Sequence, residues 1–182
     1  AVDIALDGEI VFSSSQMSGQ TVTGTAGAAL DANASTANLL ADSTLEGALT
    51  FGGGGSSFLG LGGTIVNNAE VGTVTDTVNH VSGIPDQVFL VGNGDVTTIE
   101  GTGRIIFDTT ETGIDGAGLA QSILINAGAH TLGGNGVIQQ ITLTNNASLL
   151  ANDSTLHLIS AAVNGTGTTT VETGATLLVN AS

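Results

Sequence analysis

Histidines and acidic residues are the side chains of this sequence that could take part in acid–base or metal chemistry. The chain has three histidines, His80, His130 and His157, and no two of them have a spacing typical of metal ligands. His157 lies between two leucines in a strand-like run, so we expect it to face outward. We therefore interpret each histidine as a surface side chain or as a buried one whose hydrogen bonds are satisfied.

Paired carboxylates could hydrolyse glycosidic bonds, because that reaction uses two carboxyl groups that flank the scissile bond. The candidate pairs are Asp3 with Asp7, Glu100 with Asp108, and Glu111 with Asp115. A charged polysaccharide would need cationic side chains to hold it, and the only Lys or Arg is Arg104, which we expect to pair with Glu100 or Asp108. The chain also lacks the Trp and Tyr on which sugars commonly stack. We therefore predict no catalytic residues and keep a β-helix enzyme acting on a neutral polysaccharide as the alternative.

Acidic turns raise the question of calcium, whose preferred ligands are carboxylate and carbonyl oxygens. The segments Gly92–Asp95 and Gly133–Gly136 are similar to pieces of a calcium-binding nonapeptide repeat, but the second lacks Asp and no tandem copies follow. In an extracellular setting, Ca²⁺ would offset the excess of acids. The candidate ligands are Asp76, Asp86, Asp95, Asp108 and Asp115.

The composition narrows the classes of protein to which the chain can belong. One Lys or Arg against 16 Asp plus Glu gives a net charge of 1 − 16 = −15 over 182 residues, so we expect no nucleic-acid partner. The absence of Cys excludes disulfides, thiolate metal sites and thiol nucleophiles. No run of about 18 apolar residues occurs, so we expect no direct insertion into a membrane.

The elements that must position these side chains are short β-strands. Good helix formers such as Lys, Gln, Arg and Met are scarce, whereas Thr, Val, Ser, Asn and Gly are abundant. The expected strands are Glu9–Phe12, Gly63–Val66, Gln87–Val91, Arg104–Phe107, Ser122–Ile125, Gly136–Ile138, Gln140–Leu143, Thr155–Ile159 and Ala175–Val179. Ala28–Ala41 can be read as a helix or as strands joined by a turn.

The strands recur in an irregular repeat. Gly-x-Gly corners occur at 101–103, 134–136 and 165–167, and their second glycines are 136 − 103 = 33 and 167 − 136 = 31 residues apart. A repeat of this length without helices indicates a β-solenoid, in which each short strand pairs with its copy one coil above. We predict an all-β, right-handed parallel β-helix of about eight coils, at roughly 20–25 residues per coil.

The predicted organisation is one domain. Residues 59–182 form the solenoid coils, and residues 1–58 form an irregular β-rich N-terminal segment of the same domain. The glycine-rich stretch 51–58 and the polar stretch 108–118 are expected to be loops that leave the coils.

Three segments of the C-terminal half carry a family resemblance: Gly133–Leu143, Ser154–Ser160 and Asn164–Leu178. They resemble the passenger β-helices of bacterial autotransporters and related surface adhesins, over roughly residues 60–180. The resemblance implies a right-handed parallel β-helix, export to the cell surface, and a role in adhesion, aggregation or matrix. It brings no catalytic residue. The chain is short for such a passenger and has no membrane-barrel pattern at its C-terminal end.

We therefore expect a non-catalytic structural or adhesive solenoid outside a bacterial cell. Its expected partners are copies of itself or a longer parent chain, together with host or neighbouring cell-surface molecules. Both terminal segments are strand-like, and this fits two alternatives equally well: end-to-end pairing into filaments by strand addition, or a longer parent chain whose neighbouring sequence continues the solenoid. An ice-binding role would need regular Thr-x-Thr arrays, and the Thr-x-Thr segments here are scattered.

Overall fold

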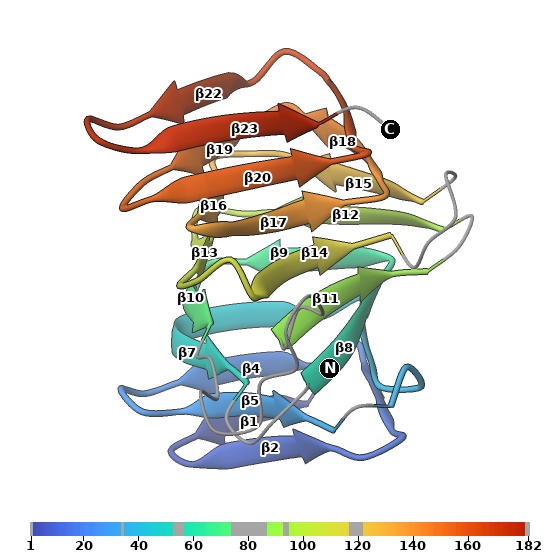
Figure 1. Ribbon diagram of the computed structural model, residues 1–182. Coiled ribbons are helices and arrows are strands. Elements are labelled where there is room, and N and C mark those ends of the chain that lie inside the picture. Colours follow the sequence, from blue (N-terminus) through green and yellow to red (C-terminus); the bar gives the residue numbers. More distant parts are fainter. Residues whose placement is uncertain are drawn as a thin grey trace.

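The computed structural model describes residues 2–33, 35–52, 57–73, 87–92, 95–116 and 122–180. All the regular secondary structure in these residues is β-strand, and all strand pairs are parallel. The strands stack into a β-solenoid of about seven turns, with β1 and β2 at the bottom of Figure 1 and β22 and β23 at the top. The predicted all-β parallel β-helix is confirmed.

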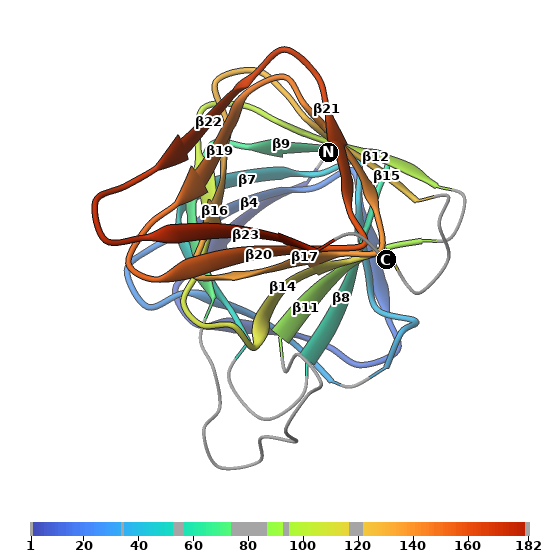
Figure 2. The same cartoon turned by 45° about the horizontal axis from the view of Figure 1, so that its top comes forward.

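Three parallel sheets form the sides of the tube (Figure 2). Sheet A contains β1 (Asp3–Leu6), β4 (Thr21–Gly24), the first part of β7 (Thr44–Phe51), β9 (Thr64–Asn67), β12 (Val96–Glu100), β15 (Ile123–Asn126), β18 (Thr142–Asn145) and β21 (Ala162–Asn164). Sheet B contains β2 (Glu9–Phe12), β5 (Ala29–Ala32), the second part of β7, β10 (Glu70–Thr73), β13 (Arg104–Phe107), β16 (Thr131–Gly134), β19 (Ser148–Ala151) and β22 (Thr168–Val171). Sheet C contains β3 (Gln16–Ser18), β6 (Leu39–Ala41), β8 (Ser57–Gly62), β11 (Gln87–Val91), β14 (Thr112–Asp115), β17 (Gly136–Gln139), β20 (Thr155–Ile159) and β23 (Thr176–Asn180).

The chain therefore climbs through eight rungs, each with one strand or part of a strand in every sheet. The first rung is β1–β3 and the eighth is β21–β23. In Figure 2 the eighth rung is turned toward the reader, and the chain runs anticlockwise as it approaches, so the coil is right-handed. Strand pairing runs without interruption from β1, so strands β1 to β7 belong to rungs of the same stack as the rest.

Side chains alternate between the inside and the outside of the tube along each strand, and the inward ones form the core. In β15, Leu124 is fully buried between two half-buried isoleucines, and it pairs with the buried Leu143 in the rung above. Similar columns run through all three sheets, because each inward residue lies beside its counterpart about 4.8 Å away. The rings of Phe51 and Phe89 stack across the interior with their centroids 4.3 Å apart.

Left-handed residues make the tight corners between sheet C and sheet A. Gly19, Asp42, Gly63, Gln140 and Ser160 each follow a strand of sheet C and have φ between 48° and 70°. This conformation turns the chain within two or three residues. Gln140 therefore belongs to a corner, and the predicted strand Gln140–Leu143 begins two residues later, at Thr142.

The Gly-x-Gly segments occupy two different kinds of corner. Segments 101–103 and 165–167 join sheet A to sheet B, whereas 134–136 joins sheet B to sheet C. The last one makes room for Phe107, since a Cβ on Gly136 would lie 2.4 Å from the Phe107 Cβ. The three Gly-x-Gly segments therefore do not occupy equivalent positions in successive rungs.

Two further predictions are corrected or resolved by the strands. The expected loop 108–118 contains β14, whose Gly113 lies so close to β17 that a Cβ there would meet the Val137 carbonyl oxygen at 1.8 Å. Residues 28–41 contain β5, a turn and β6, so the strand-and-turn reading is the one found.

Candidate functional site

The eighth rung presents core-type side chains that nothing covers in the described part of the chain. Val163, Val171 and Val179 continue the inward columns of Leu143, Ala151 and Leu158. They are 43%, 47% and 59% exposed, whereas their counterparts one rung below are buried. Each strand of this rung has a hydrogen-bonded neighbour on one side only, so the free edge can accept another strand.

The first rung is the corresponding edge at the other end of the tube. Its inward side chains are all apolar: Ile4, Leu6, Ile10, Phe12 and Met17. Its three strands pair only with the second rung. The two end rungs together form the first candidate functional surface.

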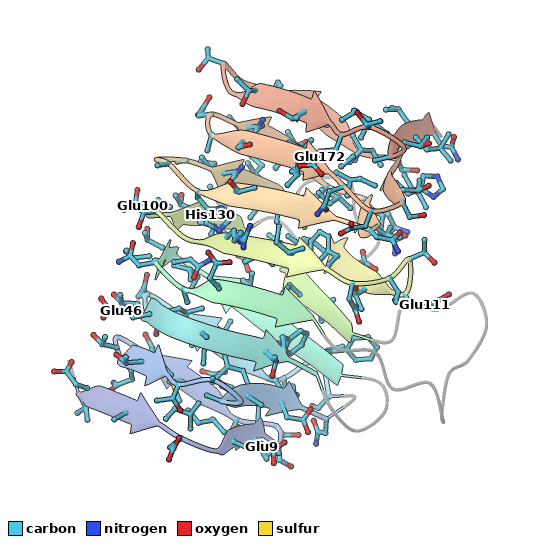
Figure 3. All side chains as sticks on the ribbon, turned by 90° about the vertical axis from the view of Figure 1, so that its left-hand side faces the viewer. Glu9, Glu46, Glu100, Glu111, His130 and Glu172 are labelled. Carbon is cyan, nitrogen blue, oxygen red and sulfur yellow. The ribbon has the colours of Figure 1, made fainter. Side chains whose placement is uncertain are left out.

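A buried polar ladder at the corner between sheets A and B is the second feature with distinctive chemistry. Asn67 Nδ2 donates to His130 Nε2 at 3.0 Å, and His130 Nδ1 donates to Asn126 Oδ1 at 2.7 Å. Asn126 Nδ2 donates to Asn145 Oδ1 at 2.9 Å, and Asn145 Nδ2 donates to the Thr168 carbonyl oxygen at 3.0 Å. All four side chains are buried, and the ladder joins the fourth rung to the eighth. Figure 3 shows His130 inside the stack, while Glu9, Glu46, Glu100 and Glu111 lie at its periphery.

The ladder fixes the protonation state of His130. Because Asn67 donates to Nε2 and Asn126 accepts from Nδ1, only the neutral ring with its proton on Nδ1 completes the chain. Asn67 cannot simply rotate, since its Oδ1 already accepts from the Ala69 N–H at 3.0 Å. Burial lowers the pKa of His130 from 6.5 to about 4, so the ring is neutral at pH 7.

Small residues make room for the ring. Strand register places His130 level with Gly103 in the rung below and with Ala147 in the rung above, and Ala69 and Gly167 continue this column. The sequence carries a signal for the asparagines that our sequence analysis did not use. Asn126 and Asn145 both end strands of sheet A, β15 and β18, at an interval of 145 − 126 = 19 residues, and they lie in register. Asn164 also ends a strand of this sheet, β21, but it pairs with Thr144 and lies outside the column.

The calcium candidates are spread over several corners. Asp108 accepts from Thr112 Oγ1 at 3.2 Å at the corner between sheets B and C. Asp115 ends β14 and accepts from Gln139 Nε2 at 2.9 Å, while exposed Asp95 precedes β12. Asp76 and Asp86 lie outside the described residues. Among the described residues, no three His, Asp or Glu side chains come together as a metal-binding group, and calcium binding stays a prediction.

The carboxylate pairs occupy the ends of strands. Glu100 ends β12 and Asp108 follows β13, so the whole width of sheet B lies between their backbones. Asp7 Oδ1 accepts from Thr25 Oγ1 at 2.6 Å. The prediction that Arg104 pairs with Glu100 or Asp108 is wrong, because its guanidinium Nε donates to Glu70, the residue beside it in the neighbouring rung.

A shallow hollow of about 350 Å³ lies over this ion pair on the outer face of sheet B. Its lining residues are Glu70, Val71, Gly72, Arg104, Ile106 and Asn152. Glu70 is the one carboxylate among them, and it is engaged by Arg104. The described wall therefore lacks the second carboxyl group that glycoside hydrolysis uses.

The two remaining histidines differ in what the structure says of them. His157 lies on the outer face of sheet C, half-buried, as predicted, with Asn180 Nδ2 at 2.9 Å from its Nε2. His80 lies outside the described residues. In the described ranges, no helix long and apolar enough to cross a membrane is present.

Comparisons of this chain with protein-family models, with curated proteins and with solved structures find no match. The solenoid architecture that the autotransporter resemblance implies is present in the structure. The link to that family rests on the sequence pattern alone.

Proposed function

We propose that this chain is a non-catalytic structural and adhesive solenoid of a bacterial cell surface, located outside the cell, that assembles end to end with copies of itself. One observation carries the proposal: the first and eighth rungs both have free strand edges and core-type inward side chains. Strand addition at such an edge supplies backbone hydrogen bonds and covers apolar surface in one step.

The side-chain chemistry supports a scaffold in place of a catalyst. The polar ladder Asn67–His130–Asn126–Asn145 is buried and faces no solvent. The described acids lie on the outside of the tube, and in the strand registers of these residues none pairs with another acid. A tube of this kind can display a long polar surface to host or neighbouring cell-surface molecules.

Sedimentation velocity over a hundredfold concentration range tests the proposal, with electron microscopy of the same samples. We expect species heavier than the 17.8-kDa monomer that grow with concentration, and unbranched rods of many lengths. Monomers alone at the highest concentration would contradict assembly.

A further inference from the structure

We infer that the eighth rung of one copy docks on the first rung of the next copy in a single defined register. The resulting junction is head-to-tail, so all copies in the assembly point in the same direction. This inference rests on the proposed function and adds the partner surface and its alignment. It begins from the spacing of the strands. In the first rung β1 starts at residue 3 and β2 at 9, and in the eighth β21 starts at 162 and β22 at 168, so both intervals are 9 − 3 = 168 − 162 = 6.

The sheet C strands of the two end rungs can also pair, because the interval between the sheet B strand and the sheet C strand already varies from rung to rung within the tube. The interval from the sheet B strand to the sheet C strand is 16 − 9 = 7 residues in the first rung and 176 − 168 = 8 in the eighth. Between the sixth and seventh rungs the same interval changes from 136 − 131 = 5 to 155 − 148 = 7, and the strands still pair in register. A difference of one residue is therefore accommodated at this corner.

In this register inward side chains meet inward side chains. Three apolar pairs form, namely Val163 over Ile4, Val171 over Phe12, and Leu177 over Met17. These pairs repeat the column packing of the interior, in which apolar residues stack on apolar residues one rung away. The other two inward residues of the eighth rung have different neighbours, because Thr169 lies over Ile10 and Val179 lies beside Gly19, just past the end of β3. Val163, Val171 and Val179 are 43%, 47% and 59% exposed in the single chain, and Leu177 is partly buried against the core.

The charges are compatible with the same alignment. Asp3 lies beside Ala162, Glu9 beside Thr168, and Glu172 beside Ser13. No acid faces an acid across the junction, as in the strand registers of the described residues within the tube. For a chain with a net charge of −15, this is the condition that close stacking requires.

Parallel head-to-tail docking has a consequence for the size of the assembly. The contact joins two different surfaces, so each added copy presents a fresh eighth rung or first rung and growth stays open. Pairing of two first rungs, or of two eighth rungs, would instead give closed dimers.

Paired cysteines test the register directly, because the chain has no Cys of its own. Val11 and Thr170 face outward and lie beside each other in the proposed junction. Adjacent strands are about 4.8 Å apart, within the roughly 4.4–6.8 Å between Cα atoms that a disulfide spans. We expect Val11→Cys with Thr170→Cys to give a ladder of covalent multimers on oxidation. The control pair Ser18→Cys with Thr170→Cys places its thiols on different sides of the tube and should give none.

A charge placed in the junction provides the second test. Val171→Asp would bury an unpaired carboxylate against Phe12, so we expect the concentration needed for assembly to rise at least about tenfold. Leu178→Asp is the matched control, since Leu178 is similarly exposed, at 41% against 47%, but faces outward. We expect it to change that concentration less than about twofold.

The outcomes separate this junction from the proposed function. Fibres of the wild-type chain, with no multimers from the Val11–Thr170 pair and normal assembly of Val171→Asp, would overturn the register and leave end-to-end assembly standing. A wild-type chain that forms only closed dimers would overturn the head-to-tail geometry. Monomers at every concentration would overturn both.

Discussion

At the scale of single residues, His130 shows how the solenoid buries a titratable group at a corner. Both ring nitrogens are hydrogen bonded, and the ladder runs in one donor direction from Asn67 to the Thr168 carbonyl oxygen. Such a chain of buried bonds stabilises the fold when complete and destabilises it when one member is lost. The ladder spans the fourth to the eighth rung at the corner that joins sheets A and B, with members from the fourth, sixth, seventh and eighth rungs.

The ladder predicts a loss of stability in acid. An unfolded His binds its proton near pH 6.5, whereas His130 in the folded chain binds it near pH 4. Between these values the unfolded state holds more protons, so the free energy of unfolding falls as the pH drops from 6.5 to 4, by up to about 3 kcal/mol. NMR titration of the His130 ring nitrogens, and urea unfolding at pH 7 and pH 4.5, measure the two quantities.

Two variants isolate this contribution from that of the many carboxylates. His130→Leu removes the partner of the Asn67 Nδ2 and Asn126 Oδ1 atoms, so we expect it to lower stability at pH 7 by about 2–4 kcal/mol and to lessen the loss between pH 7 and pH 4.5. Asn145→Ala breaks the ladder but keeps the titrating ring, so its pH dependence should follow that of the wild type. Equal pH dependence in all three proteins would refute the role given to His130.

At the scale of the elements, much of the strand pattern could be read from the sequence. Glu9–Phe12, Gln87–Val91, Arg104–Phe107 and Thr155–Ile159 were expected with the bounds that the structure has. Each is a run of apolar and β-branched residues between polar corners, so local propensity and burial agree. Corners built on unusual residues could not be predicted this way. Gln140 has φ of 55° because the coil must close there, and nothing in its residue type indicates that conformation.

The buried ladder was also beyond local reasoning. An Asn at the end of a strand is typical of an exposed turn, and only the stacking of rungs turns Asn126 and Asn145 inward beside each other. The same holds for Gly136. A side chain is excluded at this position because Phe107, one rung away, occupies the space.

The left-handed corner at Gln140 gives a prediction about stability. Gly adopts this conformation without the cost of about 1 kcal/mol that a side chain brings, so we expect Gln140→Gly to raise the free energy of unfolding by roughly 0.5–1 kcal/mol. Asp42→Gly is the comparison, because Asp42 Oδ1 accepts from the Thr64 N–H at 3.0 Å and the variant loses that bond. Thermal unfolding should show a gain for the first variant and none for the second. A lower melting temperature for Gln140→Gly would contradict this account of the corner.

The contact between Phe107 and Gly136 gives a second prediction for the elements. Gly136→Ala places a methyl group against the Phe107 side chain, and overpacking of this kind costs about 1–3 kcal/mol. Phe107→Ala removes the ring carbons that would lie 2.7 Å from the new methyl group but keeps the Phe107 Cβ at 2.4 Å, so the Gly136→Ala change should cost less in that background while keeping part of its cost. A double-mutant cycle by urea unfolding measures the coupling, which we expect to exceed about 1 kcal/mol. Additive effects would show that the ring is not what excludes a side chain at residue 136.

At the scale of the whole molecule, charge opposes the assembly that the end rungs favour. Two copies that dock end to end bring together bodies of −15 each, with one Lys or Arg apiece. The apolar pairs at the junction act over contact distance, whereas the repulsion acts over the Debye length of about 10 Å at 0.1 M salt.

Salt should therefore lengthen the filaments. Raising NaCl from 20 mM to 500 mM shortens the Debye length to a few ångströms and screens the repulsion between copies. We expect the sedimentation coefficient at fixed protein concentration to increase over this range, and the Val171→Asp variant to respond much less. Assembly that weakens as salt is added would indicate that ion pairs hold the copies together.

Fibre diffraction from aligned assemblies of the wild-type chain is the most direct test of continuous stacking. If rungs of successive copies form one uninterrupted parallel ladder, a strong reflection at about 4.8 Å lies along the fibre axis, because the strands run across that axis and are spaced along it. A 4.8 Å reflection perpendicular to the fibre axis would mean that the tubes associate side by side, and the end-to-end account would be wrong.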